Sequence, residues 1–239
     1  MLRVSHVTKK FGELVAVNDL SFHVPRGQIY GIAGPNGAGK STIYNLITGY
    51  YDFEGEILFD GTDIAGLPSH RIARMGISRT FQVPETFDSL TAEESIGVGC
   101  HFGDSEAYDQ ERVDEIIAFV DLEADRGRMA GELNLLGKKK VMIGAALATR
   151  PQMLLLDEPM AGSNAHEIRD LMELIRKINE EMGITIIIIE HFMKVLTELT
   201  TTLLIIDAGT RIAEGDPAEV IRDPRVIECY LGEEYAENN

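Results

Sequence analysis

Short runs of consecutive hydrophobic residues alternate along the chain with longer segments in which hydrophobic residues recur every three or four positions. Three of the runs cover residues 28–33, 153–156 and 185–189, and each has the length of a strand buried on both faces. Residues 40–48 and 165–182 show the hydrophobic spacing of helices. Buried strands that alternate with helices predict an α/β fold with a mainly parallel sheet core, covered on both faces.

Two other parts of the chain have a different pattern. Residues 2–7 and 20–24, with a hairpin arm at 55–61, predict an antiparallel β part near the N-terminus. From Pro84 to Ala148 hydrophobic residues recur at helical spacing, which predicts an inserted lobe that is mostly helical.

These patterns predict a single domain over residues 1–239. Its core lobe is expected at about 1–84 and 149–239, and its helical lobe at about 85–148. The tail from Pro217 predicts two short helices.

Composition narrows the classes of partner. The formal charge is −17, which disfavours binding to nucleic acid and to anionic lipid because phosphate groups are repelled. The two cysteines, Cys100 and Cys229, have no metal-type spacing and suggest no disulfide scaffold. The first residues lack a signal-peptide core, and the run at 184–189 is far too short to span a bilayer. Any membrane role is therefore expected to depend on a partner.

A phosphate-binding loop is the most specific motif. Gly34 and Gly39 bracket four residues and are followed by Lys40 and Ser41, the pattern G-x-x-x-x-G-K-[ST]. The alternative, an ordinary glycine-rich turn, is disfavoured because the motif lies between an apolar strand and a helix. Backbone amides of such a loop bind phosphates of ATP, the lysine adds a cation and the serine hydroxyl is a ligand of Mg²⁺. The predicted nucleotide contacts come from Gly34, Pro35, Asn36, Gly37, Ala38, Gly39, Lys40, Ser41 and Thr42.

A pair of acids ends the apolar strand at 153–156. In a phosphate-loop enzyme Asp157 would hold Mg²⁺ and Glu158 would orient or deprotonate the attacking water. The alternative is a strand that ends in a solvated acidic turn. His191 follows the next apolar strand, and the carboxyl ends of parallel strands share one edge of a sheet. His191 is therefore either a ligand of the γ-phosphate or a structural hydrogen-bonding residue.

Together these motifs resemble the nucleotide-binding subunit of an ABC transporter. The order is the phosphate loop, a glutamine after a strand, a helical lobe, Asp-Glu and then a histidine. The resemblance covers essentially the whole chain and is closest to the ATP-binding subunits of branched-chain amino acid uptake systems. The strings Gly76–Gln82, Asp157–Gly162 and Tyr230–Glu233 carry this finer similarity.

The resemblance implies a role for each matching residue. Phe11 would stack on adenine, although it is also interpretable as a packed hydrophobe. Gln82 would contact Mg²⁺ and water, so Ser41, Gln82 and Asp157 are the implied metal ligands. Lys40, Glu158 and His191 are the implied catalytic residues.

One motif departs from the family. The signature Leu-Ser-Gly-Gly-Gln is replaced by Leu133-Asn134-Leu135-Leu136-Gly137, so close backbone approach to a phosphate is in doubt. The following run, residues 138–140, is either a solvated helix face, which we favour, or a source of positive charge near phosphate. In this family the signature serves the ATP of the second subunit, which suggests one strong and one weak site in a heterodimer.

The resemblance therefore implies an ATPase that powers a branched-chain amino acid importer, with ATP and Mg²⁺ as cofactors. Implied partners are transmembrane permease subunits, a second ATPase subunit (related or identical) and, indirectly, a solute-binding protein. The implied location is cytoplasmic, peripheral on the inner face of the membrane. Alternatives are another ABC transport system (urea or amide import, lipid or lipopolysaccharide export), a non-transport ABC ATPase and a weakly hydrolysing regulator.

Overall fold

The computed structural model describes residues 1–102 and 108–237, with side chains up to Tyr230 in the last helix. The string Tyr230–Glu233 therefore lies, beyond its first side chain, outside the described side chains. The chain divides into two compact units. The first unit comprises Met1–Ser69 and Thr185–Asn239, and the second comprises His70–Ile184.

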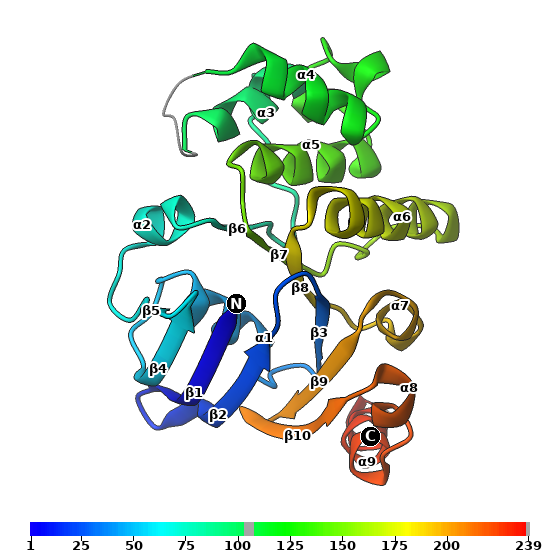
Figure 1. The fold of residues 1–239 in the computed structure, drawn as a ribbon. Coiled ribbons are helices and arrows are strands. Elements are labelled where there is room, and N and C mark those ends of the chain that lie inside the picture. The colour runs from blue at the N-terminus through cyan, green and yellow to red at the C-terminus, as the bar shows by residue number, and fades with distance from the viewer. Residues whose placement is uncertain (103–107, 238–239) are drawn as a thin grey trace. The chain divides into compact units, whose positions relative to one another are not determined.

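An antiparallel sheet opens the first unit, as predicted (Figure 1). Its strand order is β2-β1-β4-β5, with bounds of Leu14–Val24, Leu2–Phe11, Glu54–Phe59 and Thr62–Asp63. The first two strands are longer than predicted, because both extend as far as the turn at residues 12–13 and bury residues mainly on one face. Alternation over a half-buried strand is a weaker signal than a continuous hydrophobic run.

The parallel strands of the first unit lie around β3 (Ile29–Ala33). This strand pairs in parallel with β8 (Thr185–Ile189) on one side and with β9 (Thr202–Asp207) on the other. Every residue of β3 and β8 is buried, which explains their continuous hydrophobic runs. A hairpin strand, β10 (Thr210–Gly215), pairs antiparallel with β9. Strands β9 and β10 were not predicted from the sequence.

Helices of the first unit are α1 (Lys40–Ile47), α7 (Met193–Leu199), α8 (Pro217–Val220) and α9 (Pro224–Glu237). The first begins at the residue predicted for it, and the last two occupy the predicted helical tail. Helices α8 and α9 both pack against β10 (Figure 1). Burial of Val220 and Val226 fixes them to this side of the hairpin.

The second unit holds two parallel strands, β6 (Ile77–Arg79) and β7 (Met153–Asp157). Its helices are α2 (Ser69–Arg74), α3 (Ala92–Cys100), α4 (Gln110–Phe119), α5 (Leu135–Ala148) and α6 (Ala165–Met182), with single turns at Glu123–Asp125 and Ala130–Glu132. Helices α3, α4 and α5 pack on one another (Figure 1). The α/β fold with an antiparallel N-terminal part and a helical insertion is thus confirmed. The division into lobes at residues 85–148 stays a prediction.

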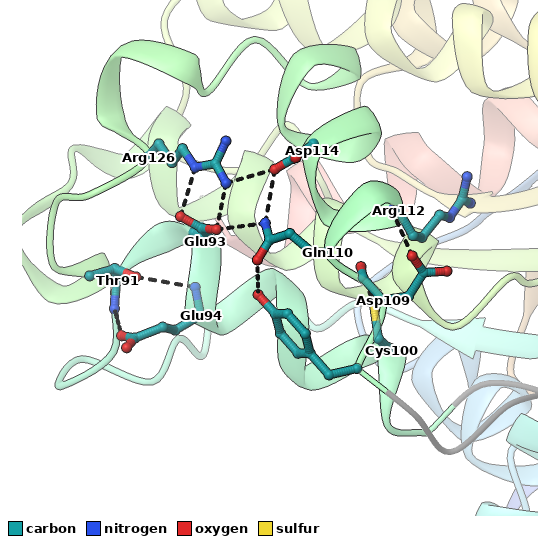
Figure 2. A network of polar contacts seen from close by, with 10 residues as sticks. Thr91, Glu93, Glu94, Cys100, Asp109, Gln110, Arg112, Asp114 and Arg126 are labelled. Carbon is teal, nitrogen blue, oxygen red and sulfur yellow. Dashed lines mark hydrogen bonds and ion pairs between the residues drawn. The ribbon is translucent and has the colours of Figure 1, made fainter.

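A network of ion pairs ties α3 to α4 (Figure 2). The Arg126 guanidinium donates to Glu93 Oε2 at 2.7 Å and to Asp114 Oδ1 at 2.6 Å. Gln110 Nε2 donates to the same two carboxylates, at 2.8 and 2.9 Å. Hydrogen bonds from Arg126 and Gln110 lower the pKa of Glu93 to about 2. The helical insertion is therefore stabilised by charge as well as by its apolar core.

In the described part of the chain, no helix is both long and apolar enough to cross a membrane.

Candidate nucleotide-binding and catalytic site

The predicted phosphate loop leaves the carboxyl end of β3 and leads directly into α1. Gly34 has φ +155°, and a Cβ there would lie 1.9 Å from the carbonyl oxygen of Ile206. Gly39 has φ +101°, and its Cβ would lie 2.4 Å from the carbonyl oxygen of Ala16. Both positions therefore require glycine, and the loop lies close against the neighbouring backbone. Gly39 is also the N-cap of α1 and provides no side-chain cap. The N-terminus of a helix favours an anion, because its first amides point outward along the helix axis.

Lys40 lies within this loop. Its residue is 6% exposed, and Nζ donates to the carbonyl oxygens of Gly34 at 2.6 Å and Pro35 at 2.7 Å. Both bonds hold the ammonium against the first two residues of the loop. Among the other predicted contacts, Asn36, Gly37 and Ser41 are exposed, whereas Pro35, Ala38 and most of Thr42 are covered.

Phe11 ends β1 and has an aromatic partner, Tyr51, that was not predicted from the sequence. The ring is 40% exposed and meets Tyr51 edge to face, with centroids 5.0 Å apart. Lys9 Nζ lies 5.0 Å from the Phe11 centroid and 5.5 Å from that of Tyr51, and it pairs with Asp52 at 2.5 Å. Phe11 is thus neither buried nor isolated. The two consecutive tyrosines, Tyr50 and Tyr51, are the feature of the sequence that could have indicated an aromatic partner for Phe11.

His191 follows β8, which pairs in parallel with β3 through Ile32 and Ile189. The phosphate loop and His191 therefore leave neighbouring strands at the same end of the sheet. The imidazole is exposed, and the backbone N–H of His191 donates to Glu190 Oε2 at 3.2 Å. Glu190 itself is 1% exposed. This placement suits a residue that meets a ligand at the strand ends.

In the second unit, Asp157 forms an ion pair that was not predicted. Arg79 Nη2 donates to Asp157 Oδ2 at 2.7 Å, and the two side chains are 10% and 7% exposed. The pairing follows from the parallel register of β6 and β7, in which Arg79 lies opposite Leu155. Because Asp157 is buried and compensated by a cation, the alternative of a solvated acidic turn is wrong.

Glu158 and Gln82 are also brought together. Gln82 Nε2 donates to Glu158 Oε2 at 2.6 Å. The backbone of Glu158 has φ +46°, a left-handed conformation that costs a residue with a side chain about 1 kcal/mol or more. Strained backbone of this kind is concentrated at functional sites and persists only where the surroundings hold it.

The predicted Mg²⁺ ligands suit that ion by their chemistry. Ser41, Gln82 and Asp157 offer a hydroxyl, an amide oxygen and a carboxylate, all of them hard oxygen donors. The hydrogen bond from Gln82 Nε2 to Glu158 turns the amide oxygen away from that carboxylate. Within the described residues, no group of three or more His, Cys, Asp and Glu forms a metal cage. Mg²⁺ at a nucleotide site needs few protein ligands, since waters and phosphates supply the rest.

The segment that departs from the family signature lies at the start of α5. Asn134 is the N-cap of α5, and its Oδ1 accepts a hydrogen bond from the backbone N–H of Gly137 at 2.8 Å. The polar side chain is therefore engaged in capping the helix. A solvated face for residues 138–140 is wrong for Lys139, which is only 2% exposed. Lys139 donates instead to Ala161 and Ser163, in the loop after Glu158.

A glycine loop of this geometry before a helix is typical of a protein that binds the phosphates of a nucleotide, and similarity to known proteins narrows the class further. Residues 17–161 match the family described as ABC transporter, and residues 210–236 match the family described as branched-chain amino acid ATP-binding cassette transporter. The chain belongs to the ATP-binding subunits of the ABC transporter family.

Among the relatives is the high-affinity branched-chain amino acid transport ATP-binding protein BraF of Pseudomonas aeruginosa, 37% identical, with 98% of each chain covered. LivG of Escherichia coli K12, also described as a high-affinity branched-chain amino acid transport ATP-binding protein, is 33% identical with the same coverage.

Solved structures of ABC transporter cassettes also resemble this chain. The ADP conformation of MJ1267, an ATP-binding cassette of an ABC transporter, is 33% identical, covers 97% of this chain and 98% of its own, and has a TM-score of 0.88. A dimeric structure of the cassette MJ0796 bound to ADP and phosphate is 26% identical, covers 91% of this chain and 99% of its own, and has a TM-score of 0.81.

Proposed function

We propose that this chain is the ATPase subunit of an importer for branched-chain amino acids. The observation that carries the proposal is the match of the tail, residues 210–236, to a family defined by that transport class. Relatives described as branched-chain amino acid transport proteins align with it over nearly their whole length. The reaction is ATP + H₂O → ADP + phosphate, and its free energy drives movement of the solute by other subunits.

The phosphate loop is the proposed binding site for the triphosphate. Its glycines let the loop lie close against the neighbouring backbone, and the first amides of α1 are the proposed donors to the phosphates. Lys40, already held within the loop, supplies the cation for the γ-phosphate. Phe11 is the proposed contact for adenine, since its ring is partly exposed and rests edge-on against Tyr51.

Glu158 is the proposed catalytic carboxylate. It orients the attacking water and accepts its proton as the new bond to phosphorus forms. Gln82 already bonds to this carboxylate and keeps it oriented. Mg²⁺, held by Ser41, Gln82 and Asp157, would neutralise charge on the phosphates. His191 is the proposed contact for the γ-phosphate.

The family also suggests how the subunit is assembled. We propose transmembrane permease subunits and a second ATPase subunit as direct partners, and a solute-binding protein as an indirect one. We therefore also propose that the chain lies at the cytoplasmic face of the membrane. Because Leu135 and Leu136 occupy the glycine positions of the signature, we propose that the chain pairs with a different ATPase subunit and forms the weaker half of that partner's site.

Glu158→Gln tests the catalytic role. The variant is expected to bind ATP normally, to lose hydrolysis and to retain bound ATP in a dimer. Glu173→Gln, an exposed residue of α6, is the matched control and should hydrolyse ATP like the unchanged chain. Full turnover by Glu158→Gln would rule out this residue as the catalytic carboxylate.

The transported solute requires the assembled transporter. Reconstituted with the permease and solute-binding subunits encoded with it, the chain should drive ATP-dependent uptake of leucine, isoleucine and valine. Uptake of urea or amides, with no uptake of these amino acids, would refute the substrate assignment and leave the ATPase assignment intact.

Site asymmetry has its own test. The chain is mixed with its ATPase partner, and the catalytic glutamate of one or the other is changed to glutamine. Unequal turnover of the two mixtures is expected, and equal turnover would refute the asymmetry.

A further inference from the structure

Lys139 connects the first turns of α5 to the loop that joins β7 to α6, here called the linking loop (residues 158–163). Its Nζ donates to the carbonyl oxygen of Ala161 at 2.6 Å and to Ser163 Oγ at 2.8 Å. The two bonds span 22 and 24 positions of sequence. Lys139 is 2% exposed, so these bonds are shielded from water and are stronger than exposed ones.

The contact belongs to one face of α5. Leu135 and Lys139 are four residues apart, so their side chains lie one above the other on the helix. A Cβ built on Gly162 would lie 3.1 Å from Leu135 Cδ2, which shows that this leucine also lies against the linking loop. One helix face thus contacts three successive loop residues, through an apolar side chain and a charged one.

The linking loop in turn determines the backbone of Glu158. The N–H of Ala161 donates to the carbonyl oxygen of Glu158 at 3.1 Å, and the N–H of Ser163 donates to that of Met160 at 3.1 Å. The peptide held by Lys139 is therefore next to the turn that starts at Glu158. Because the left-handed φ of Glu158 is unfavourable by itself, it requires fixed neighbours.

The ends of the loop are fixed separately. Asp157 belongs to β7, and Asn164 is the N-cap of α6, accepting from the N–H groups of His166 and Glu167. Lys139 holds the middle of the loop, where neither the strand nor the cap reaches.

We propose that Lys139 is a positioning residue for hydrolysis: it holds the linking loop so that Glu158 keeps its left-handed backbone and its carboxylate stays oriented on Gln82. This inference rests on the catalytic role proposed for Glu158. It also assigns a function within this chain to the helix that carries the altered signature.

The first test is amide hydrogen exchange of the full chain without nucleotide. In Lys139→Met the amides of Ala161 and Ser163 should exchange roughly tenfold faster or more, the ratio expected for losing a hydrogen bond from a charged donor. Lys138→Met is the matched control, because Lys138 is on the same helix turn but points about 100° away. Its exchange in the linking loop should equal that of the unchanged chain. Exchange in Lys139→Met that matches Lys138→Met would overturn the proposal.

The second test is the steady-state kinetics of ATP hydrolysis. In Lys139→Met kcat should fall roughly tenfold while KM for ATP stays within about twofold, since Lys139 positions a catalytic group and does not bind the nucleotide. Lys139→Arg, which keeps a charged donor, should recover most of the activity. A joint change of kcat and KM, with faster exchange throughout α5 and β7, would indicate general loosening and overturn the proposal.

Ser163→Ala keeps the proposal testable even if Lys139→Met does not fold. It should raise exchange of the same amides and lower kcat, each roughly threefold, because one acceptor of the ammonium is lost. Combined with Lys139→Met it should add nothing further, since Ser163 acts through Lys139. Unchanged exchange and kcat in Ser163→Ala would overturn the proposal. Failure of the proposed catalytic role of Glu158 can be distinguished from failure of this inference. Full turnover by Glu158→Gln would refute the catalytic role, but it would leave the hydrogen-exchange results for Lys139 unaffected.

Discussion

Arg79→Met probes the buried ion pair between Arg79 and Asp157. The change removes the guanidinium that donates to Asp157 Oδ2 at 2.7 Å and keeps a long apolar side chain in its place. Both partners are at most 10% exposed, so water cannot replace the lost hydrogen bond. Asp157 would then be a buried carboxylate without this cation.

The expected loss is set by that burial. Removing one partner of a buried ion pair costs about 3–5 kcal/mol, because the remaining charge stays desolvated. In a chain of 239 residues each kcal/mol lowers the midpoint of thermal unfolding by about 2–4 °C. Arg79→Met should therefore unfold at least about 6 °C below the unchanged chain. Some of this loss reflects the contact of the guanidinium with Phe81, whose centroid lies 5.2 Å away.

Circular dichroism during heating and in urea measures the effect. Two causes contribute to the loss of stability in Arg79→Met: the uncompensated carboxylate of Asp157 and the lost contact with Phe81. The double variant Arg79→Met, Asp157→Asn separates them, because it removes the carboxylate charge but still lacks the Phe81 contact. It should be more stable than Arg79→Met by about 1 kcal/mol or more. Equal stability of the two variants, or a loss below about 1 kcal/mol for Arg79→Met, would refute the reasoning.

Three further predictions concern other parts of the site and fold. Gly39→Ala should weaken binding of a fluorescent ATP analogue by at least roughly tenfold, because its Cβ meets a backbone oxygen, whereas Gly66→Ala, at φ +69°, with nothing within 4 Å of the added Cβ and outside the predicted nucleotide contacts, should leave binding unchanged. The pKa of Glu93 is lowered from 4.5 to about 2, so its ion pair with Arg126 stabilises the fold fully above pH 4.5 and is lost as the pH falls toward 2. The difference in unfolding midpoint between Glu93→Gln and the unchanged chain should accordingly shrink over that interval, and a constant difference would contradict this. Asn134→Ala should lower the free energy of unfolding in urea by about 1 kcal/mol through loss of the cap on α5, and Asn134→Ser should restore most of it.

Three buried strands, one long helix and the phosphate loop follow from sequence alone. Strands β3, β7 and β8 are continuous hydrophobic runs because both of their faces are buried, and α6 has the predicted bounds because its periodicity and its Asn164 cap are local. The phosphate loop is equally local, since its glycines, lysine and serine are consecutive and their spacing is the signal.

Pairings between distant residues required the tertiary structure. The run at residues 138–140 has three identical side chains, and nothing in its pattern distinguishes the buried lysine from its neighbours. Lys139 is buried because the linking loop, more than twenty positions later, folds over that helix face. The same holds for Arg79 with Asp157 and for Phe11 with Tyr51. Periodicity along a chain specifies which face of an element is buried, whereas the packing of elements distant in sequence determines what that face contacts.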